Sequence, residues 1–102
     1  MQSLQRINDL AKAIDLEPNY VNAHLQKAAC EIALGLIAEA RKTLEVAHKL
    51  DTVVTDDQLY AANCYFEIGE LVKVEQICKL ILTDEPDHPG AKQLLHSVKR
   101  GQ

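Results

Sequence analysis

The sequence of 102 residues has no tryptophan and only four other aromatic residues, three tyrosines and one phenylalanine. It also contains only four glycines and three prolines, so residues that break helices are few. Hydrophobic residues make up 47% of the chain and charged residues 25%, which is typical of a folded domain and excludes a disordered tail. This composition is compatible with a chain that is helical throughout.

Cysteine and long apolar runs are also scarce. The three cysteines, Cys30, Cys64 and Cys78, are too few for a disulfide framework, which favours a reducing compartment. No apolar run approaches the roughly 18 residues of a membrane-spanning helix, and the segment Met1–Arg6 lacks the pattern of a signal peptide. We therefore expect no membrane insertion, and either a cytoplasmic protein or one whose signal sequence has been removed.

An excess of basic residues is absent as well. Eleven lysines and arginines against fifteen aspartates and glutamates give a formal net charge of -4. A chain with this charge is not drawn to nucleic acid or to an acidic membrane surface by bulk attraction. We therefore expect no nucleic-acid partner.

The residue patterns of catalytic and metal sites are missing. None of the four histidines has a second histidine or a cysteine four residues away, the spacing that places two metal ligands on one helix face. The four glycines are isolated, which excludes a phosphate-binding loop. The acidic cluster Asp84, Glu85 and Asp87 lacks the spacing of a calcium loop. The sequence thus predicts no enzyme, no cofactor and no metal site.

A repeat with a period of 34 residues runs through the chain. Identical residues coincide at this spacing: Leu25 with Leu59, Ala28 with Ala62, Cys30 with Cys64, and Gly35 with Gly69. A further series, Pro18, Thr52 and Pro86, follows an acidic residue each time. We predict a single repeat domain over 1–102, in which 21–54 and 55–88 are full repeats. Residues 1–20 are then the second half of a repeat with its closing turn, and 89–102 are a C-terminal helix.

Apolar residues recur at helical spacing in six stretches, which span 4–14, 21–32, 37–50, 59–66, 71–82 and 91–98. Gly35 is expected to end the second helix with a positive φ, and Gly69 occupies the same place in the next repeat. Thr55 with Gln58 fits a capping box, and Asp87 is expected to cap the last helix, with Pro89 in its first turn. The predicted fold class is all-α, with six helices and no strands.

The repeat resembles the tetratricopeptide repeat (TPR) family in its length and in its turn, closing and small residues. Those residues are Gly35 and Gly69, Pro18 and Pro86, and Ala28, Ala40, Ala47 and Ala62. Departures from the family pattern are Thr52 at the closing position, His24 and Gln58 where tryptophan is common, and Lys27 and Glu31 at usually apolar positions. The resemblance implies a right-handed superhelix of antiparallel helix pairs, an α-α solenoid.

The resemblance also implies a function, that of a non-enzymatic protein-interaction module or adaptor whose concave groove binds a peptide or helical segment of a partner. The implied partner-binding residues are Asn22, Leu25, Gln26 and Ala29, then Leu59, Tyr60, Asn63 and Glu67, and finally Gln93 and Leu94. Tyr60 is the best candidate for a hot spot. Because Asp56 and Glu67 make the groove acidic, we expect a basic or amphipathic segment.

A second function stays open, that of a structural scaffold that self-associates through its terminal helices. Both ends of the chain carry apolar residues that no neighbouring helix is expected to cover, namely Leu4, Ile7, Leu94 and Leu95. We also expect that the chain is a fragment of a longer repeat protein. The sequence does not identify the partner.

Overall fold

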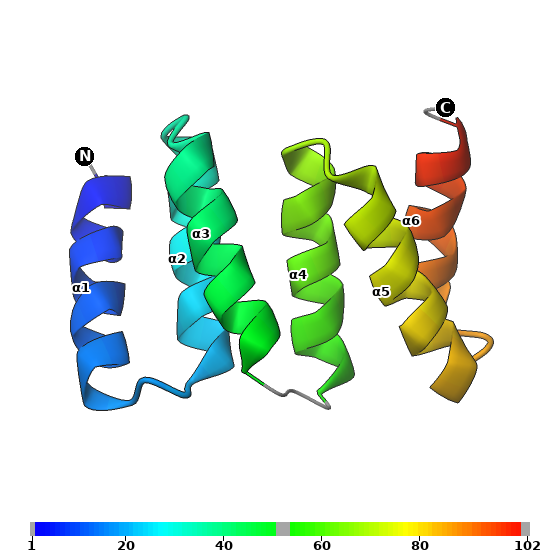
Figure 1. The fold of residues 1–102 in the computed structure, drawn as a ribbon, viewed down its shortest axis with the longest axis horizontal. Coiled ribbons are helices and arrows are strands. Elements are labelled where there is room, and N and C mark those ends of the chain that lie inside the picture. The colour runs from blue at the N-terminus through cyan, green and yellow to red at the C-terminus, as the bar shows by residue number, and fades with distance from the viewer. Residues whose placement is uncertain (1, 51–53, 101–102) are drawn as a thin grey trace. The chain divides into compact units, whose positions relative to one another are not determined.

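The computed structural model describes residues 2–50 and 54–100, which form six α-helices (Figure 1). The helices are α1 (Gln2–Leu16), α2 (Val21–Ala33), α3 (Ile37–Lys49), α4 (Thr55–Glu67), α5 (Leu71–Asp84) and α6 (Pro89–Arg100). No strand occurs within these two ranges. The predictions of an all-α fold and of six helices are confirmed, whereas Asp51 and Thr52 of the repeat series lie outside the described residues.

The helices form two compact units, unit 1 (Met1–Thr52) with α1 to α3 and unit 2 (Val53–Gln102) with α4 to α6. In unit 1, α2 packs against both α1 and α3. In unit 2, α5 packs against both α4 and α6, and α4 also contacts α6. The single repeat domain and the right-handed superhelix stay predictions.

Glycines end the first helix of each full repeat in the same way. Gly35 has φ 77° and Gly69 has φ 81°, a backbone region that favours glycine. The Gly35 N–H donates to the Ile32 carbonyl at 3.0 Å, and the Leu36 N–H donates to the Glu31 carbonyl at 2.8 Å. In unit 2 the equivalent pair is Gly69 to Phe66 at 3.1 Å and Glu70 to Tyr65 at 2.9 Å. These are the two bonds of a Schellman motif, so the predicted role of Gly35 is confirmed.

The turns that close the repeats are also equivalent. The Tyr20 N–H donates to the Glu17 carbonyl at 3.0 Å, and the His88 N–H donates to the Glu85 carbonyl at 3.0 Å. The two turns are separated by 85 − 17 = 68 positions, twice the predicted period of 34. Pro18 and Pro86 follow the two acceptors and hold the same place in each turn. The repeat seen in the sequence is therefore also a repeat of backbone hydrogen bonds.

The predicted capping box of Thr55 and Gln58 at the start of α4 is wrong. Val54, which has an extended backbone, is the N-cap of α4, and it makes no side-chain capping bond. The Gln58 N–H donates to the Val54 carbonyl at 3.1 Å. Thr55 is already helical, and its Oγ1 donates to Glu85 Oε2 at 2.9 Å. The threonine thus connects the start of α4 to the end of α5 instead of capping its own helix.

The predicted cap of α6 is wrong by one residue. His88 immediately precedes Pro89, and its Nδ1 accepts a hydrogen bond from the Ala91 N–H at 3.2 Å. Asp87 instead forms an ion pair with Lys92 at 3.2 Å. Because the turn 85–88 leaves His88 as the last residue before the helix, its side chain is the one within reach of the free N–H groups. Pro89 is the first helical residue, as predicted.

Small side chains occupy the most deeply buried positions of both units. The residues with no exposed surface are Ala28, Ala40, Ala62, Val74, Cys78, Ala91 and Val98. Alanine at a helix–helix contact allows the two backbones to approach closely. Cys64 is also buried, and Cys30 is half-buried, so the cysteines act largely as small apolar residues.

The apolar terminal residues are covered unequally. Leu4 is 53% exposed, as predicted. Leu94 is only 9% exposed, so the prediction that it lies uncovered at the end of the chain is wrong. Ile7 and Leu95 are half-buried. Leu94 is covered because α6 contacts both α4 and α5.

Candidate functional site

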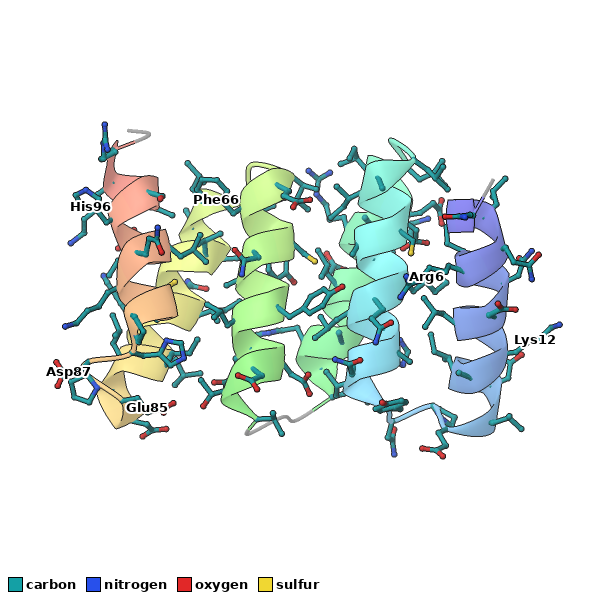
Figure 2. All side chains as sticks on the ribbon, turned by 180° about the vertical axis from the view of Figure 1, so that it is seen from behind. Arg6, Lys12, Phe66, Glu85, Asp87 and His96 are labelled. Atoms are coloured by element: carbon teal, nitrogen blue, oxygen red, sulfur yellow. The ribbon has the colours of Figure 1, made fainter. Side chains whose placement is uncertain are left out.

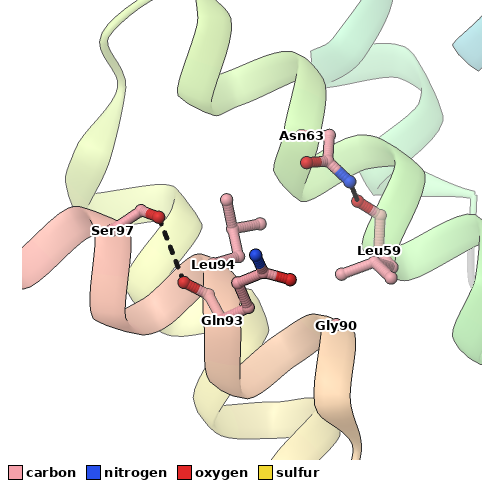
Figure 3. Close-up of a pocket in the computed structure, with 6 residues that line it drawn as sticks. All are labelled: Leu59, Asn63, Gly90, Gln93, Leu94 and Ser97. Atoms are coloured by element: carbon pink, nitrogen blue, oxygen red, sulfur yellow. Dashed lines mark hydrogen bonds between the residues drawn. The ribbon is translucent and has the colours of Figure 1, made fainter.

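An open hollow of about 320 Å³ lies between α4 and α6 in unit 2 (Figure 3). Leu59 and Asn63 line it from α4, and Gly90, Gln93, Leu94 and Ser97 line it from α6. Leu59 and Asn63 are four positions apart, as are Gly90 and Leu94 and also Gln93 and Ser97, so each helix presents one face to the hollow. The hollow brings together four of the predicted partner-binding residues, Leu59, Asn63, Gln93 and Leu94.

Gly90 sets how closely Leu59 approaches α6. A Cβ atom placed on Gly90 would lie 2.8 Å from Leu59 Cδ2 and 3.2 Å from His88 Cε1. Real Cβ atoms do not come this close to a carbon atom, so a larger residue would push the Leu59 side chain away. The missing side chain of Gly90 therefore shapes one wall of the hollow, a role that its isolated position in the sequence did not indicate.

Two of the polar side chains in the hollow are bonded to their own helices. Asn63 Nδ2 donates to the Leu59 carbonyl at 3.0 Å, and Ser97 Oγ donates to the Gln93 carbonyl at 3.1 Å. These bonds leave Asn63 Oδ1 and the lone pairs of Ser97 Oγ available as acceptors. The Gln93 side-chain amide has no hydrogen-bond partner within the described part of the chain, and it offers both donors and an acceptor.

The lining of the hollow is neutral. Leu59 and Leu94 provide apolar surface, and none of the six lining residues carries a charge. The hollow can therefore hold an apolar side chain while the amides of Asn63 and Gln93 bond to a peptide backbone. Asp56 and Glu67, on which the expectation of a basic partner depends, are exposed on α4 but do not line the hollow.

Polar residues predicted on α2 are bonded to one another and to α1. Gln26 Nε2 donates to Asn22 Oδ1, and Arg6 Nη2 donates to Gln26 Oε1 at 3.3 Å. The Arg6 side chain extends from α1 towards α2 (Figure 2). Arg6 was missed in the sequence, although it stands 34 positions before Ala40, where the repeat has a small residue. Because both ends of the Gln26 amide already have partners in the chain, this group is less available than that of Gln93.

The remaining predicted residues do not meet at the hollow. Leu25 is 1% exposed and belongs to the core, so its predicted place on a binding surface is wrong. It lies within the run Ala23–Leu25 of buried residues, where the face of α2 is packed. Tyr60 and Ala29 are half-buried, and Glu67 is exposed. Neither Tyr60 nor Glu67 lines the hollow.

The cysteines of unit 2 are poor nucleophiles. Burial raises the pKa of the Cys64 thiol from 9.0 to about 12, and the nearby Glu67 carboxylate adds to the rise. Burial also raises the pKa of Cys78. Both thiols therefore stay protonated at neutral pH, when the thiolate would be the reactive form.

The described residues contain neither a cluster of metal-binding side chains nor a helix that could cross a membrane. No three of their histidine, cysteine, aspartate and glutamate side chains are grouped so that they could hold a metal ion. None of their helices has both the length and the apolar character needed to cross a membrane.

Comparison with known proteins identifies no family model or curated protein similar to this chain. The likeness to the TPR family thus rests on the period of 34 residues and on the residues that recur within it.

Proposed function

We propose that this chain is a non-enzymatic protein-interaction module that binds a short segment of a partner protein at the hollow between α4 and α6. The observation that carries the proposal is the hollow itself, where Leu59 and Leu94 lie beside the available amide groups of Asn63 and Gln93. Apolar surface with a few well-placed polar groups is typical of binding sites. The TPR resemblance supports the same function independently.

Affinity capture with the intact chain tests this proposal. We expect the double variant Asn63→Ala/Gln93→Ala to lose most of the captured partner while its melting temperature stays unchanged. Gln76→Ala is a matched control, because Gln76 is an exposed amide of unit 2 outside the hollow. Equal capture by the double variant and by the control would contradict the proposal.

Tyr60 is tested separately, because only the family resemblance implies that it binds. If the partner also contacts this part of α4, Tyr60→Ala weakens binding at an unchanged melting temperature, since tyrosine provides a large contact area. Unchanged affinity would remove Tyr60 from the site and leave the hollow as the binding surface.

A cytoplasmic location belongs to the same proposal. It is supported by the free thiols of Cys30, Cys64 and Cys78, because unpaired cysteines are typical of reducing compartments.

Self-association is the second candidate function, and one observation favours it. Leu4 and Leu16 of α1 are 53% and 84% exposed, so this helix presents apolar surface. The support is one-sided, because Leu94 and Val98 of α6 are buried. An end-to-end contact would need apolar surface on both helices.

A further inference from the structure

Two carboxylates flank the α4 side of the hollow. Asp56, Leu59, Asn63 and Glu67 follow one another at intervals of three, four and four residues, so they form a single stripe along α4. Leu59 and Asn63, in the middle of the stripe, line the hollow. Asp56 and Glu67, at its two ends, are exposed. The neutral hollow therefore has an acidic residue on each side.

Neither carboxylate is neutralised by an ion pair within the described part of the chain. Two ion pairs within unit 2, Lys79 with Glu75 and Lys92 with Asp87, involve other carboxylates. Arg100 is a cation that could pair with Glu67, because it lies three residues after Ser97 and thus near the hollow face of α6. It forms no ion pair with Glu67, so both carboxylates are open to a cation from outside.

From this arrangement we infer that the site binds an extended segment in which an uncharged aliphatic residue lies between two basic residues. The inference depends on the proposed function and names the chemistry of its partner. The aliphatic side chain enters the hollow beside Leu59 and Leu94. The basic residues pair with Asp56 and Glu67.

The available amides favour an extended segment over a helix. A ligand in the hollow displaces water from the exposed Asn63 and Gln93 side chains, and the free N–H and C=O groups of an extended backbone can replace those hydrogen bonds. A helix uses those groups for its own hydrogen bonds. The sequence left both helical and extended ligands open, and the available amides favour the extended one.

The length of the stripe sets the spacing of the two basic residues. Asp56 and Glu67 are separated by 67 − 56 = 11 positions, or about 16 Å along the axis of α4. An extended peptide covers this distance in about five residues. Because alternate side chains of an extended peptide share a face, a pentapeptide with a basic residue at each end and an aliphatic residue in the middle presents all three to the site. Its ends are about 13 Å apart, and the long lysine side chains cover the remaining distance to the two carboxylates.

Synthetic peptides of this design test the inference by NMR on the intact, ¹⁵N-labelled chain. The probe is a blocked pentapeptide with lysine at both ends, leucine at the third position and alanine elsewhere, so that the three side chains share one face when the peptide is extended. One comparison peptide has glutamate at both ends, and another has alanine in place of leucine. We expect the lysine–leucine peptide to shift the side-chain amide signals of Asn63 and Gln93.

The charge preference has a defined size and a defined origin. The lysine peptide forms two exposed ion pairs with Asp56 and Glu67, whereas the glutamate peptide places two like charges there. We therefore expect the lysine peptide to bind about tenfold more tightly than the glutamate peptide. The preference should disappear in Asp56→Asn/Glu67→Gln and shrink as salt is raised to about 0.5 M. It should persist in Asp84→Asn, because Asp84 is an exposed acid of unit 2 outside the stripe. Arg100→Gln should increase it.

The outcomes separate this inference from the proposed function. The inference is overturned if the lysine and glutamate peptides bind equally or if neither binds at millimolar concentration. It is also overturned if the preference survives in the Asp56/Glu67 variant, or if the peptide changes NMR signals only outside the hollow. The proposed function would still stand if capture of a partner required Asn63 and Gln93. If capture does not require them, the proposed function fails whatever charge the peptides prefer.

Discussion

At the scale of single residues, the same repeat position is occupied by a carboxylate in one unit and by a phenol ring in the other. Glu31 is 4% exposed, and its carboxylate accepts hydrogen bonds from Thr43 Oγ1 at 2.7 Å and from Lys27 Nζ at 3.1 Å. Tyr65, one period later, is buried with the Lys73 ammonium 5.4 Å from its ring centroid. Glu31 of α2 contacts Thr43 of α3, and Tyr65 of α4 contacts Lys73 of α5. The same position in the two helix pairs therefore accommodates either a carboxylate or an aromatic ring.

Removal of the Glu31 carboxylate should destabilise the chain. We expect Glu31→Ala to lower the free energy of unfolding by about 1–3 kcal/mol, because Thr43 and Lys27 lose a charged hydrogen-bond acceptor. The cost stays moderate since the Lys27 side chain is 24% exposed and can turn towards water. Urea denaturation measures it, with Glu45→Ala on the exposed face of α3 as the control. Equal losses in the two variants would contradict the role of Glu31.

The different burial of the three cysteines predicts the order in which their thiols react. In the folded chain at about pH 8, iodoacetamide should modify the half-buried Cys30 first. Cys64 and Cys78 should react only as the chain unfolds, because burial raises the pKa of both thiols. Peptide mass spectrometry over time measures the order, and early labelling of Cys64 would contradict it.

The same pKa shift predicts how stability depends on pH. The unfolded chain releases the Cys64 proton above pH 9.0, while the folded chain holds it up to about pH 12. The unfolded state therefore binds fewer protons in this range, so the free energy of unfolding should fall as the pH rises from 9.0. Cys64→Ala should flatten this part of the profile, measured by urea denaturation at several pH values.

At the scale of the helices, the turns show which ends are determined locally. Gly35 and Gly69 end α2 and α4 with the same pair of backbone hydrogen bonds, because glycine adopts the positive φ of this motif without steric cost. The start of α6 depends on the path of the turn 85–88, so His88 takes the capping role predicted for Asp87. At the start of α4, Thr55 bonds to Glu85, the residue that follows α5.

The cap of α6 can be identified by substitution. We expect His88→Ala to lower the free energy of unfolding by about 0.5–2 kcal/mol, since the Ala91 N–H loses its acceptor. His88→Asn should retain most of the stability, because asparagine is a good capping residue. Asp87→Ala removes only an exposed ion pair with Lys92 and should have a smaller effect. A larger loss for Asp87→Ala would restore Asp87 as the cap.

At the scale of the whole molecule, apolar surface is distributed unevenly between the first and last helices. α1 exposes Leu4 and Leu16, whereas α6 buries Leu94 and Val98 and exposes polar residues, Lys92, His96 and Lys99. His96 points away from the neighbouring helices (Figure 2). Contact between α1 of one copy and α6 of another would therefore place apolar side chains against charged ones.

We accordingly expect a monomer across a concentration series in multi-angle light scattering. End-to-end dimers would support the scaffold alternative instead. Leu4→Gln then tests whether such a dimer forms through α1. It should dissociate a dimer that uses α1 and leave any other association unchanged. Lys42→Gln, on the exposed face of α3, is the matched surface control.

The sequence by itself determined the period of 34 residues, the six helices and the glycines that end α2 and α4. These features follow from hydrophobic spacing and backbone preferences over a few neighbouring residues. That Leu59, Asn63, Gln93 and Leu94 belong to one binding face was implied by the TPR resemblance and not by the spacing alone.

Only the tertiary structure decided which predicted surface residues are accessible and which polar groups meet. Leu25 and Leu59 are identical in the repeat, yet Leu25 is in the core while Leu59 lines a hollow beside Gly90. The contact of Arg6 with Gln26 and that of Thr55 with Glu85 join residues 20 and 30 positions apart. Such contacts depend on how helices pack, because packing sets the distances between side chains that no local pattern relates.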